Sequence, residues 1–296
     1  MVVTGWNARA SSGNPFSSLV VSAMVSPVEQ SKVLAFRRSP GQGRPVVFVH
    51  GNSSSSRTWH HILDGPFGQR YRCLAPDLPG HGASAPAPGP SDYSVPGHAA
   101  ALAAFATELG AEDAVLVGWS LGGHIALQAA ALLPAAPGIA VFGTPPIGSA
   151  ADVAEGFLPN PAMGAGFTAD IGEAEAQAYA AASLGPASAV PPADLVPDIL
   201  ATDGAARAGL GASLAEGRFA DEVRIVGSLD RPLAVLHGAG EQLVNLDYLR
   251  RLAIPSLWRG AVQVVPGAGH ALQEEAPQAL ADLLELFFAD LPFAAA

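Results

Sequence analysis

The feature that most constrains this chain is a G-x-S-x-G pattern at residues 118–122, with Ser120 at its centre. An apolar run at 114–117 precedes the pattern and an Ala-rich helical run at 121–133 follows it. The serine therefore falls at a turn from a strand into a helix. A turn this sharp strains the serine backbone and exposes the hydroxyl above a sheet, and its glycines avoid collisions that larger side chains would make. The pattern in this context predicts a nucleophilic serine.

Strand-like and helix-like runs alternate on both sides of this turn. Alternation at these lengths predicts an α/β fold with a mostly parallel, doubly wound sheet. We expect strands at 32–38, 45–49, 71–76, 114–118, 139–142, 232–237 and 261–265, and helices at 57–63, 95–109, 121–133, 246–252 and 277–288.

The alternation stops between Thr144 and about Leu229. This stretch is rich in Pro, Gly and Ala, contains short helical pieces and has no strong strand. It predicts a helical cap inserted over the carboxyl ends of the strands, where ligands bind in open α/β sheets. We expect a leader at 1–30, a core at 31–146 and 230–296, and the helical cap at 147–229.

The leader differs from the rest of the chain, with Ser/Gly-rich pieces and a short apolar stretch at 19–25. Only one basic residue, Arg9, precedes that stretch, so we expect a disordered leader and a cytoplasmic protein, with a secretory signal as the alternative. The single cysteine, Cys73, permits no intramolecular disulfide, which fits a reducing compartment.

Composition limits the partners that the chain can bind. Hydrophobic residues make up 49% and charged residues 14%, enough to bury a core. The net charge of -11, without Lys/Arg clusters, opposes binding to nucleic acids or anionic membranes. No apolar run approaches the ~18 residues needed to span a bilayer. We therefore expect a small-molecule substrate and a monomer or weak oligomer.

A serine nucleophile needs an adjacent base and an acid that orients the base. His270 follows the last expected strand in a glycine-rich loop, which places it at the same sheet edge as Ser120. Glu241 follows the penultimate strand, where the acid is expected in the chain order Ser, Asp/Glu, His. Glu241 is favoured over Asp247, whose position suits the first turn of the next helix.

The transition state of acyl transfer needs hydrogen-bond donors for an oxyanion. We expect the backbone N–H of Leu121, after the serine, and that of Asn52, in the loop after the 45–49 strand. The side-chain amide of Asn52 can also bind substrate, or can only hold the turn. Trp119 and four residues of the expected cap are candidates to line an acyl channel: Phe157, Leu158, Met163 and Phe167.

No cofactor is expected. The sequence contains no P-loop, no dinucleotide fingerprint and no HExxH or similar metal cluster. A serine at the turn favours hydrolysis through an acyl-enzyme.

These residues resemble the α/β-hydrolase superfamily and, within it, the AidH-type N-acyl-homoserine lactonases. The resemblance covers about 220 residues, and the strings HGNSSS and GWSLGGHI are its most specific parts. Its matching strings are HGNSSS at His50, APDLPGHG at Ala75, GWSLGGHI at Gly118, GTPP at Gly143, TDG at Thr202, LW at Leu257 and AGH at Ala268.

The resemblance implies a metal-independent enzyme that opens the lactone ring of acyl-homoserine lactones and so silences bacterial quorum signals. The family triad falls on Ser120, Glu241 and His270. The substrate-binding Asn falls on Asn52, and a cap tyrosine that contacts the polar head of the substrate falls on Tyr179.

The chain departs from the family at Gly240, where Asp is expected, and at Asn245, where Glu is expected. These differences affect the shape of the loop and acyl-chain preference. A general carboxylesterase, a haloperoxidase-like perhydrolase and a non-enzymatic ligand receptor remain open as alternatives.

Overall fold

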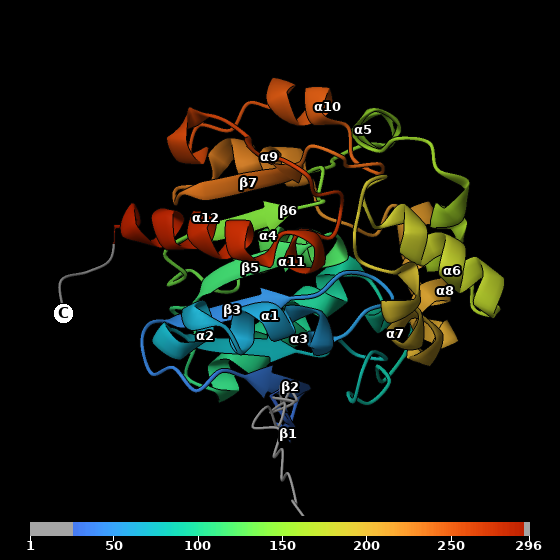
Figure 1. The fold of residues 1–296 in the computed structure, drawn as a ribbon, viewed down its shortest axis with the longest axis horizontal. Coiled ribbons are helices and arrows are strands. Elements are labelled where there is room, and N and C mark those ends of the chain that lie inside the picture. Colours follow the sequence, from blue (N-terminus) through green and yellow to red (C-terminus); the bar gives the residue numbers. More distant parts are fainter. Residues whose placement is uncertain (1–25, 293–296) are drawn as a thin grey trace, which may run out of the picture.

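The computed structural model describes residues 26–292 and is built around one eight-stranded sheet (Figure 1). The order is β1-β2-β4-β3-β5-β6-β7-β8, with β1–β2 and β2–β4 antiparallel and the other pairs parallel. The predicted α/β architecture is therefore confirmed. The strands are β1 (Val28–Gln30), β2 (Ala35–Arg38), β3 (Pro45–Val49), β4 (Arg72–Pro76), β5 (Val115–Trp119), β6 (Ile139–Phe142), β7 (Leu233–Gly238) and β8 (Gln263–Val265).

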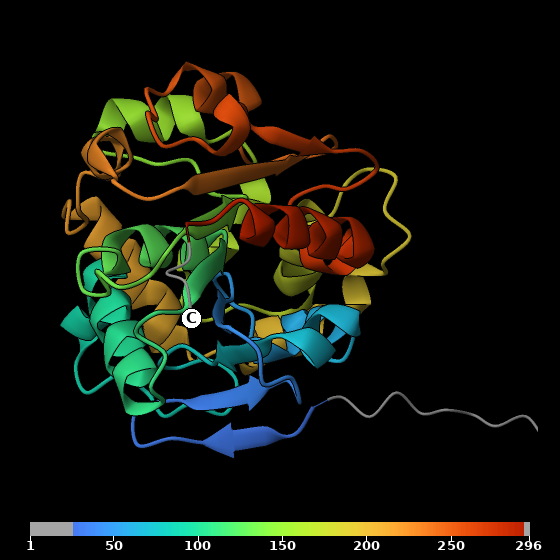
Figure 2. The same ribbon diagram turned by 90° about the vertical axis from the view of Figure 1, so that its left-hand side faces the viewer.

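Helices cover both faces of the sheet, which gives the three layers visible in Figure 2. Successive side chains of a strand point to opposite faces, so β3 contributes side chains to two hydrophobic cores, one on each face of the sheet. Val46 and Phe48 pack in the cluster that contains Trp59, whereas Val47 and Val49 pack in the other cluster. The helices are α1 (His60–Leu63), α2 (Pro66–Arg70) and α12 (Pro277–Ala289) on the first face, and α3 (Val95–Glu108) and α4 (Leu121–Ala129) on the second.

Shorter helical elements connect these layers. They are η1 (Ser56–Trp59), η2 (Pro90–Asp92), α10 (Leu246–Arg251), η5 (Trp258–Gly260) and α11 (Leu272–Glu275). None of the helices in residues 26–292 combines the length and the apolar character needed to cross a bilayer.

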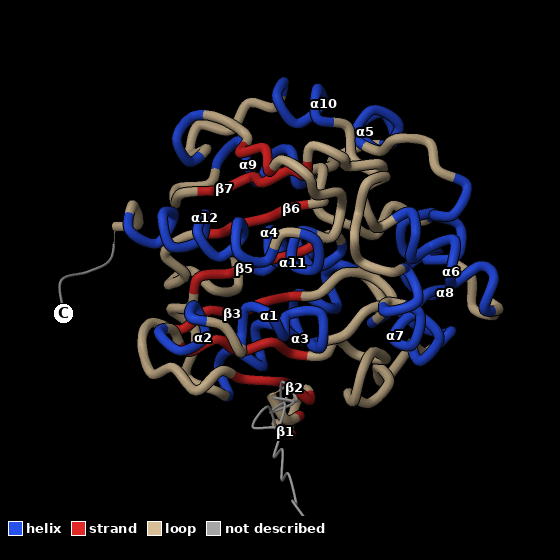
Figure 3. The backbone as a smooth tube through the Cα atoms, in the orientation of Figure 1, coloured by secondary structure: helices blue, strands red, loops and turns tan. Residues whose placement is uncertain are grey.

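The chain between β6 and β7 is helical and contains none of the sheet strands (Figure 3). We call residues 150–228 the helical segment. Its central part, α6 to α8, lies beyond the carboxyl ends of the parallel strands (Figure 1). The elements are α5 (Ala150–Gly156), η3 (Pro161–Phe167), α6 (Glu173–Ala182), η4 (Pro192–Asp194), α7 (Val196–Ala201), α8 (Gly204–Ala215) and α9 (Glu222–Ser228).

The expected leader, residues 1–30, includes three residues that belong to the sheet. Val28–Gln30 forms the edge strand β1, with Gln30 opposite Ala35. The strand is held by pairing with β2 and is largely exposed, so it carries no apolar periodicity that the sequence could reveal. Residues 1–25, the rest of the expected leader, lie outside the described residues.

Two helix boundaries also differ from the prediction. The helix expected at 57–63 is divided into η1 and α1. The helix expected to continue to 133 ends at Ala129, and turns follow it. Pro134 disfavours helical backbone at Leu133, the last residue of the expected helix.

The first turn of α4 touches the backbone of β3. A Cβ atom added to Gly122 would lie 2.1 Å from the carbonyl oxygen of Val49 and 2.6 Å from that of His50. Both contacts are with backbone atoms, which cannot rotate away. A glycine at this position therefore allows α4 to start directly against the sheet.

We predict that Gly122→Ala lowers the free energy of unfolding by about 1–3 kcal/mol, because overpacking outweighs the gain of about 1 kcal/mol that alanine brings to a helix. Gly227→Ala is the matched control, since Gly227 is exposed on α9 and the nearest atom to an added Cβ is 3.7 Å away. The control should gain up to about 1 kcal/mol. Chemical denaturation measures both, and a Gly122→Ala protein as stable as wild type would contradict the prediction.

Candidate active site

Ser120 lies between β5 and α4 with backbone angles φ 54° and ψ −121°. Positive φ is uncommon for non-glycine residues, and among the described residues other than glycine only Ser53, Ser120 and Arg259 adopt it. Hydrogen bonds hold both sides of the turn: Ser120 N–H donates to the carbonyl of Phe142 (2.9 Å), and Thr144 Oγ1 donates to the carbonyl of Ser120 (2.8 Å). The strained turn is therefore fixed from the neighbouring strand.

His270 and Glu241 form a buried pair. Their side chains are 4% and 1% exposed, and His270 Nδ1 lies 2.8 Å from Glu241 Oε2. The other carboxylate oxygen, Oε1, accepts a hydrogen bond from the N–H of Leu243 (2.7 Å). An ionised carboxylate can only accept, so Nδ1 carries the hydrogen and Nε2 is left as a base.

The electrostatics of this pair favour an ionised Glu241. Burial alone would raise the pKa of its carboxyl group. The charge of His270, the hydrogen bond from its ring and the hydrogen bond from Leu243 oppose burial, and the net effect lowers the pKa of Glu241. The pair therefore presents a carboxylate that can stabilise an imidazolium.

Two further residues position His270. Trp119, expected to contact substrate, donates its indole N–H to the carbonyl of His270 (2.9 Å), although it also lines the cavity in front of Ser120. Gly143 has φ 61°, and a Cβ atom there would lie 2.6 Å from Cε1 of the imidazole. Sequence reasoning missed both roles; the GTPP string that contains Gly143 was the available signal.

Asn52 and Leu121 flank Ser120, and neither backbone N–H donates to another described residue. The side chain of Asn52 is engaged, because its amide donates to the carbonyl of Gly166 in η3 (2.6 Å). Ser53 donates to the oxygen of the same amide (3.2 Å). The side chain of Asn52 thus links the loop after β3 to the helical segment.

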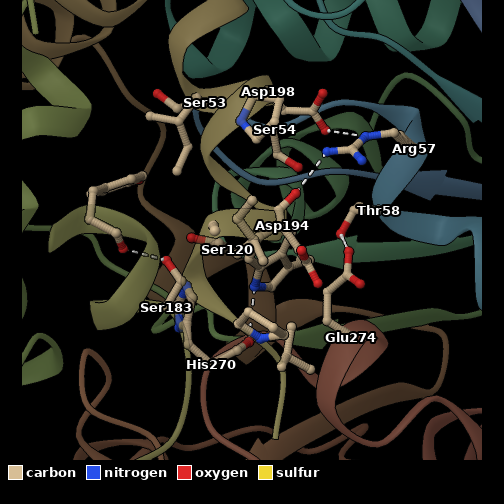
Figure 4. Close-up of a pocket in the computed structure, with 18 of the residues that line it drawn as sticks. Ser53, Ser54, Arg57, Thr58, Ser120, Ser183, Asp194, Asp198, His270 and Glu274 are labelled. Atoms are coloured by element: carbon tan, nitrogen blue, oxygen red, sulfur yellow. Dashed lines mark hydrogen bonds and ion pairs between the residues drawn. The ribbon is translucent and has the colours of Figure 1, made fainter. Parts of the chain in front are cut away.

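Two cavities of different character meet at Ser120, Asn52 and Tyr179. The first cavity, about 610 Å³, is the more polar of the two and is called the polar cavity; it opens toward α1 and η4, and Figure 4 shows Ser120 and His270 facing it together. Its other polar side chains are Ser53, Ser54, Arg57, Thr58, His60, His61, Ser183, Asp194, Asp198 and Glu274.

The apolar cavity, about 580 Å³, lies between α4 and the helical segment. All four residues expected for an acyl channel line it. Its apolar side chains are Val95, Leu121, Ile147, Ala150, Val153, Phe157, Leu158, Met163, Phe167, Leu210, Leu214, Ala215 and Phe219.

Tyr179 on α6 is 8% exposed and borders both cavities. Burial raises the pKa of its hydroxyl to about 12, so the group is a neutral donor at physiological pH. The hydroxyl makes no hydrogen bond to another described residue. Tyr179 packs with Ala176 and Val196 in the core of the helical segment, and it lines the same two cavities as Ser120.

Comparison with known families fits this geometry. Residues 46–283 match the sequence model described as the alpha/beta hydrolase family. The chain belongs to the α/β-hydrolase family. The α/β-hydrolase fold and the similarity to lactonase and esterase structures support a hydrolase.

This α/β-hydrolase also resembles individual proteins. A variant of the N-acyl homoserine lactonase AidH, solved with N-hexanoyl homoserine lactone, is 34% identical with a TM-score of 0.83, covering 90% of this chain and 97% of that one. The non-heme haloperoxidase of Rhodococcus erythropolis is 29% identical over 253 residues, 80% of this chain and 89% of that protein. An uncharacterized protein of Mycobacterium bovis is 36% identical over 97 residues, so the chain spans about a quarter (28%) of its length. The resemblance to AidH expected from the sequence is confirmed.

The α/β-hydrolase contains further titratable groups that sequence reasoning did not assign to the site. In the described residues, one group of His, Cys, Asp or Glu side chains has ligand atoms close enough to share a metal ion: His60, His61 and Glu274, within 4.8 Å of one another. The group borders the polar cavity but does not include the His270–Glu241 pair. A second pair, His124 with Glu222, faces the apolar cavity.

We predict a pH-dependent stability contribution from Glu241. Its folded pKa is lowered, so the contribution is present above the ordinary value of 4.5 and is lost as pH falls through the folded pKa. The difference in free energy of unfolding between wild type and Glu241→Gln should therefore decrease in this acidic window, and urea denaturation at a series of pH values measures it.

Glu216→Gln, which removes a carboxylate that is 62% exposed, is the control for loss of one charge. The prediction would be contradicted if the difference in free energy of unfolding between wild type and Glu241→Gln stayed constant, or rose, as pH falls.

Proposed function

We propose that this α/β-hydrolase opens the lactone ring of N-acyl-homoserine lactones, with Ser120, His270 and Glu241 as its triad. The observation that carries the proposal is the meeting of a polar and an apolar cavity at Ser120. An acyl-homoserine lactone has a polar ring and amide joined to an apolar chain, so it fits both cavities when its ring carbonyl is at the serine. The similarity to AidH supports this substrate class.

In the proposed mechanism, Ser120 Oγ attacks the lactone carbonyl carbon while His270 Nε2 takes the hydroxyl proton. Glu241 stabilises the imidazolium that forms. When the tetrahedral intermediate collapses, the ring C–O bond breaks and His270 gives its proton to the departing ring oxygen. Water, deprotonated by the same imidazole, then hydrolyses the acyl-enzyme to give N-acyl-homoserine and the free serine.

The oxyanion in this mechanism is stabilised by the backbone N–H groups of Asn52 and Leu121. Each such donor contributes about 10²–10³ in rate. The hydroxyl of Tyr179 binds the polar head of the substrate, and the indole of Trp119 forms part of the wall next to it. The side chain of Asn52 acts through Gly166, by holding η3 over the serine.

We also propose that residues 147–229 act as a cap on a core formed by 31–146 and 230–296. The helical segment supplies most of the apolar cavity, and the core supplies Ser120, His270 and Glu241. Differences in acyl-chain preference among related enzymes would then arise in the cap, while the chemistry stays in the core. Opening of the lactone would lower the concentration of a bacterial quorum signal.

We predict that purified wild-type enzyme opens N-hexanoyl-homoserine lactone and retains this activity after EDTA treatment, because the nucleophile is a serine activated by an imidazole. The chelator also tests whether an ion at His60, His61 and Glu274 contributes. Ring opening is measured by mass spectrometry, with p-nitrophenyl butanoate hydrolysis in parallel. Ser120→Ala should lower both activities by at least about 10³ and leave the circular dichroism spectrum unchanged.

Other outcomes identify the alternatives. Hydrolysis of the aryl ester without lactone opening would indicate a general carboxylesterase. Peroxide-dependent oxidation supported by acetate would indicate a perhydrolase, the activity class suggested by the 29% identical haloperoxidase. Tight lactone binding without product would indicate a ligand receptor, and wild-type-like turnover by Ser120→Ala would contradict the triad.

A further inference from the structure

A second histidine–carboxylate pair lines the apolar cavity, where most of the surrounding side chains are hydrophobic. His124 Nδ1 is 2.7 Å from Glu222 Oε2, and the two side chains are 10% and 1% exposed. Glu222 also accepts hydrogen bonds from the amide of Gln128 (2.6 Å) and the N–H of Ile147 (3.3 Å). Its carboxylate is therefore fully engaged within the protein.

These contacts determine which atom of His124 is available. A carboxylate that already accepts two hydrogen bonds also accepts the third, so Nδ1 of His124 carries the hydrogen. The described residues offer Nε2 no partner, although His124 lines the cavity. Nε2 therefore faces the cavity as a free acceptor, and in apolar surroundings such an atom favours a ligand that brings a polar group to it.

The wall around this nitrogen is apolar. The ring of Phe157 has its centroid 6.2 Å from that of His124, and Ile147 and Leu121 line the same cavity. Asn160, another polar residue of the wall, uses its side chain to cap η3 through Ala162 N–H. His124 is thus positioned to supply polar recognition to a chain that is otherwise bound by apolar contacts.

The helical spacing between His124 and Ser120 is comparable to the length of a short acyl chain. His124 is four residues after Ser120, one helical turn along α4, and its N–H lies 3.4 Å from the carbonyl of Ser120. One turn advances by about 5–6 Å, and the side chain points back toward the N-terminus. In an acyl-homoserine lactone, the third carbon of the acyl chain lies about 6 Å from the ring carbonyl when extended, by analogy with peptide dimensions.

We propose that His124, oriented by Glu222, binds an oxygen substituent on the third carbon of the acyl chain. The neutral imidazole accepts a hydrogen bond from a 3-hydroxyl group, and the imidazolium donates one to a 3-oxo group. This assignment rests on the proposed lactonase function. It makes His124 a specificity residue, distinct from the His270 that acts on the reacting bond.

The test compares N-hexanoyl-, N-(3-oxohexanoyl)- and N-(3-hydroxyhexanoyl)-homoserine lactone with wild type, His124→Leu and His124→Gln. We expect wild type to prefer at least one oxygenated lactone, and His124→Leu to lower the ratio of kcat/KM for that lactone to kcat/KM for N-hexanoyl by about tenfold. His124→Gln should retain part of the ratio because its amide can still hydrogen-bond. Phe157→Leu is the matched control, since it changes the same wall without removing a polar atom and should affect all three lactones alike.

A binding measurement tests the same preference without turnover and in a protein that keeps His124. In the Ser120→Ala protein, calorimetry should give a lower Kd for the preferred oxygenated lactone than for N-hexanoyl-homoserine lactone. Equal affinities, or an unchanged ratio in a folded His124→Leu enzyme that opens N-hexanoyl-homoserine lactone, would overturn the role of His124 alone. Failure of wild type to open any of the three lactones would overturn the proposed function, and this inference with it.

Discussion

The backbone turn at Ser120 is the constraint on which the rest of the molecule depends. A positive φ at a serine is sustained because β5 is paired on both sides and α4 starts within contact of the β3 backbone. Gly122 permits that contact, and Thr144, in the loop after β6, donates a hydrogen bond to the carbonyl of Ser120. The strain is confined to Ser120, and contacts from β3, β6 and Thr144 hold its backbone in this conformation.

Around this turn the fold arranges two histidine–carboxylate pairs in different surroundings. His270 and Glu241 come from loops after β8 and β7, and they border the polar cavity through His270. His124 and Glu222 come from α4 and α9, and they border the apolar cavity. The two pairs have the same chemical groups, but they differ in function because the cavity around each imidazole determines which groups of a ligand can reach it.

The parts of the site that the sequence predicts are those that follow local rules. Ser120 lies in a five-residue pattern, and His270 and Glu241 each follow a strand at the edge where parallel strands end. Contacts between distant segments were not predictable, because they depend on side-chain directions in the assembled fold. Trp119 reaches the carbonyl of His270, 151 residues away, and the amide of Asn52 reaches Gly166, 114 residues away. The edge strand β1 escaped prediction for the opposite reason, since it buries no apolar face.

The helical segment is hydrogen-bonded to the loop that carries His270. The carboxylate of Glu275 accepts hydrogen bonds from the N–H groups of Gly185 and Gly269, both at 2.8 Å. Gly185 follows α6 in the helical segment and Gly269 precedes His270, so Glu275 links the two parts of the chain. The N–H of Ala271, the residue after His270, donates to the carbonyl of Ser183 (3.1 Å). Swinging the segment outward would break these bonds and displace the imidazole. These three hydrogen bonds therefore couple the position of the helical segment at the end of α6 to the position of the His270 imidazole.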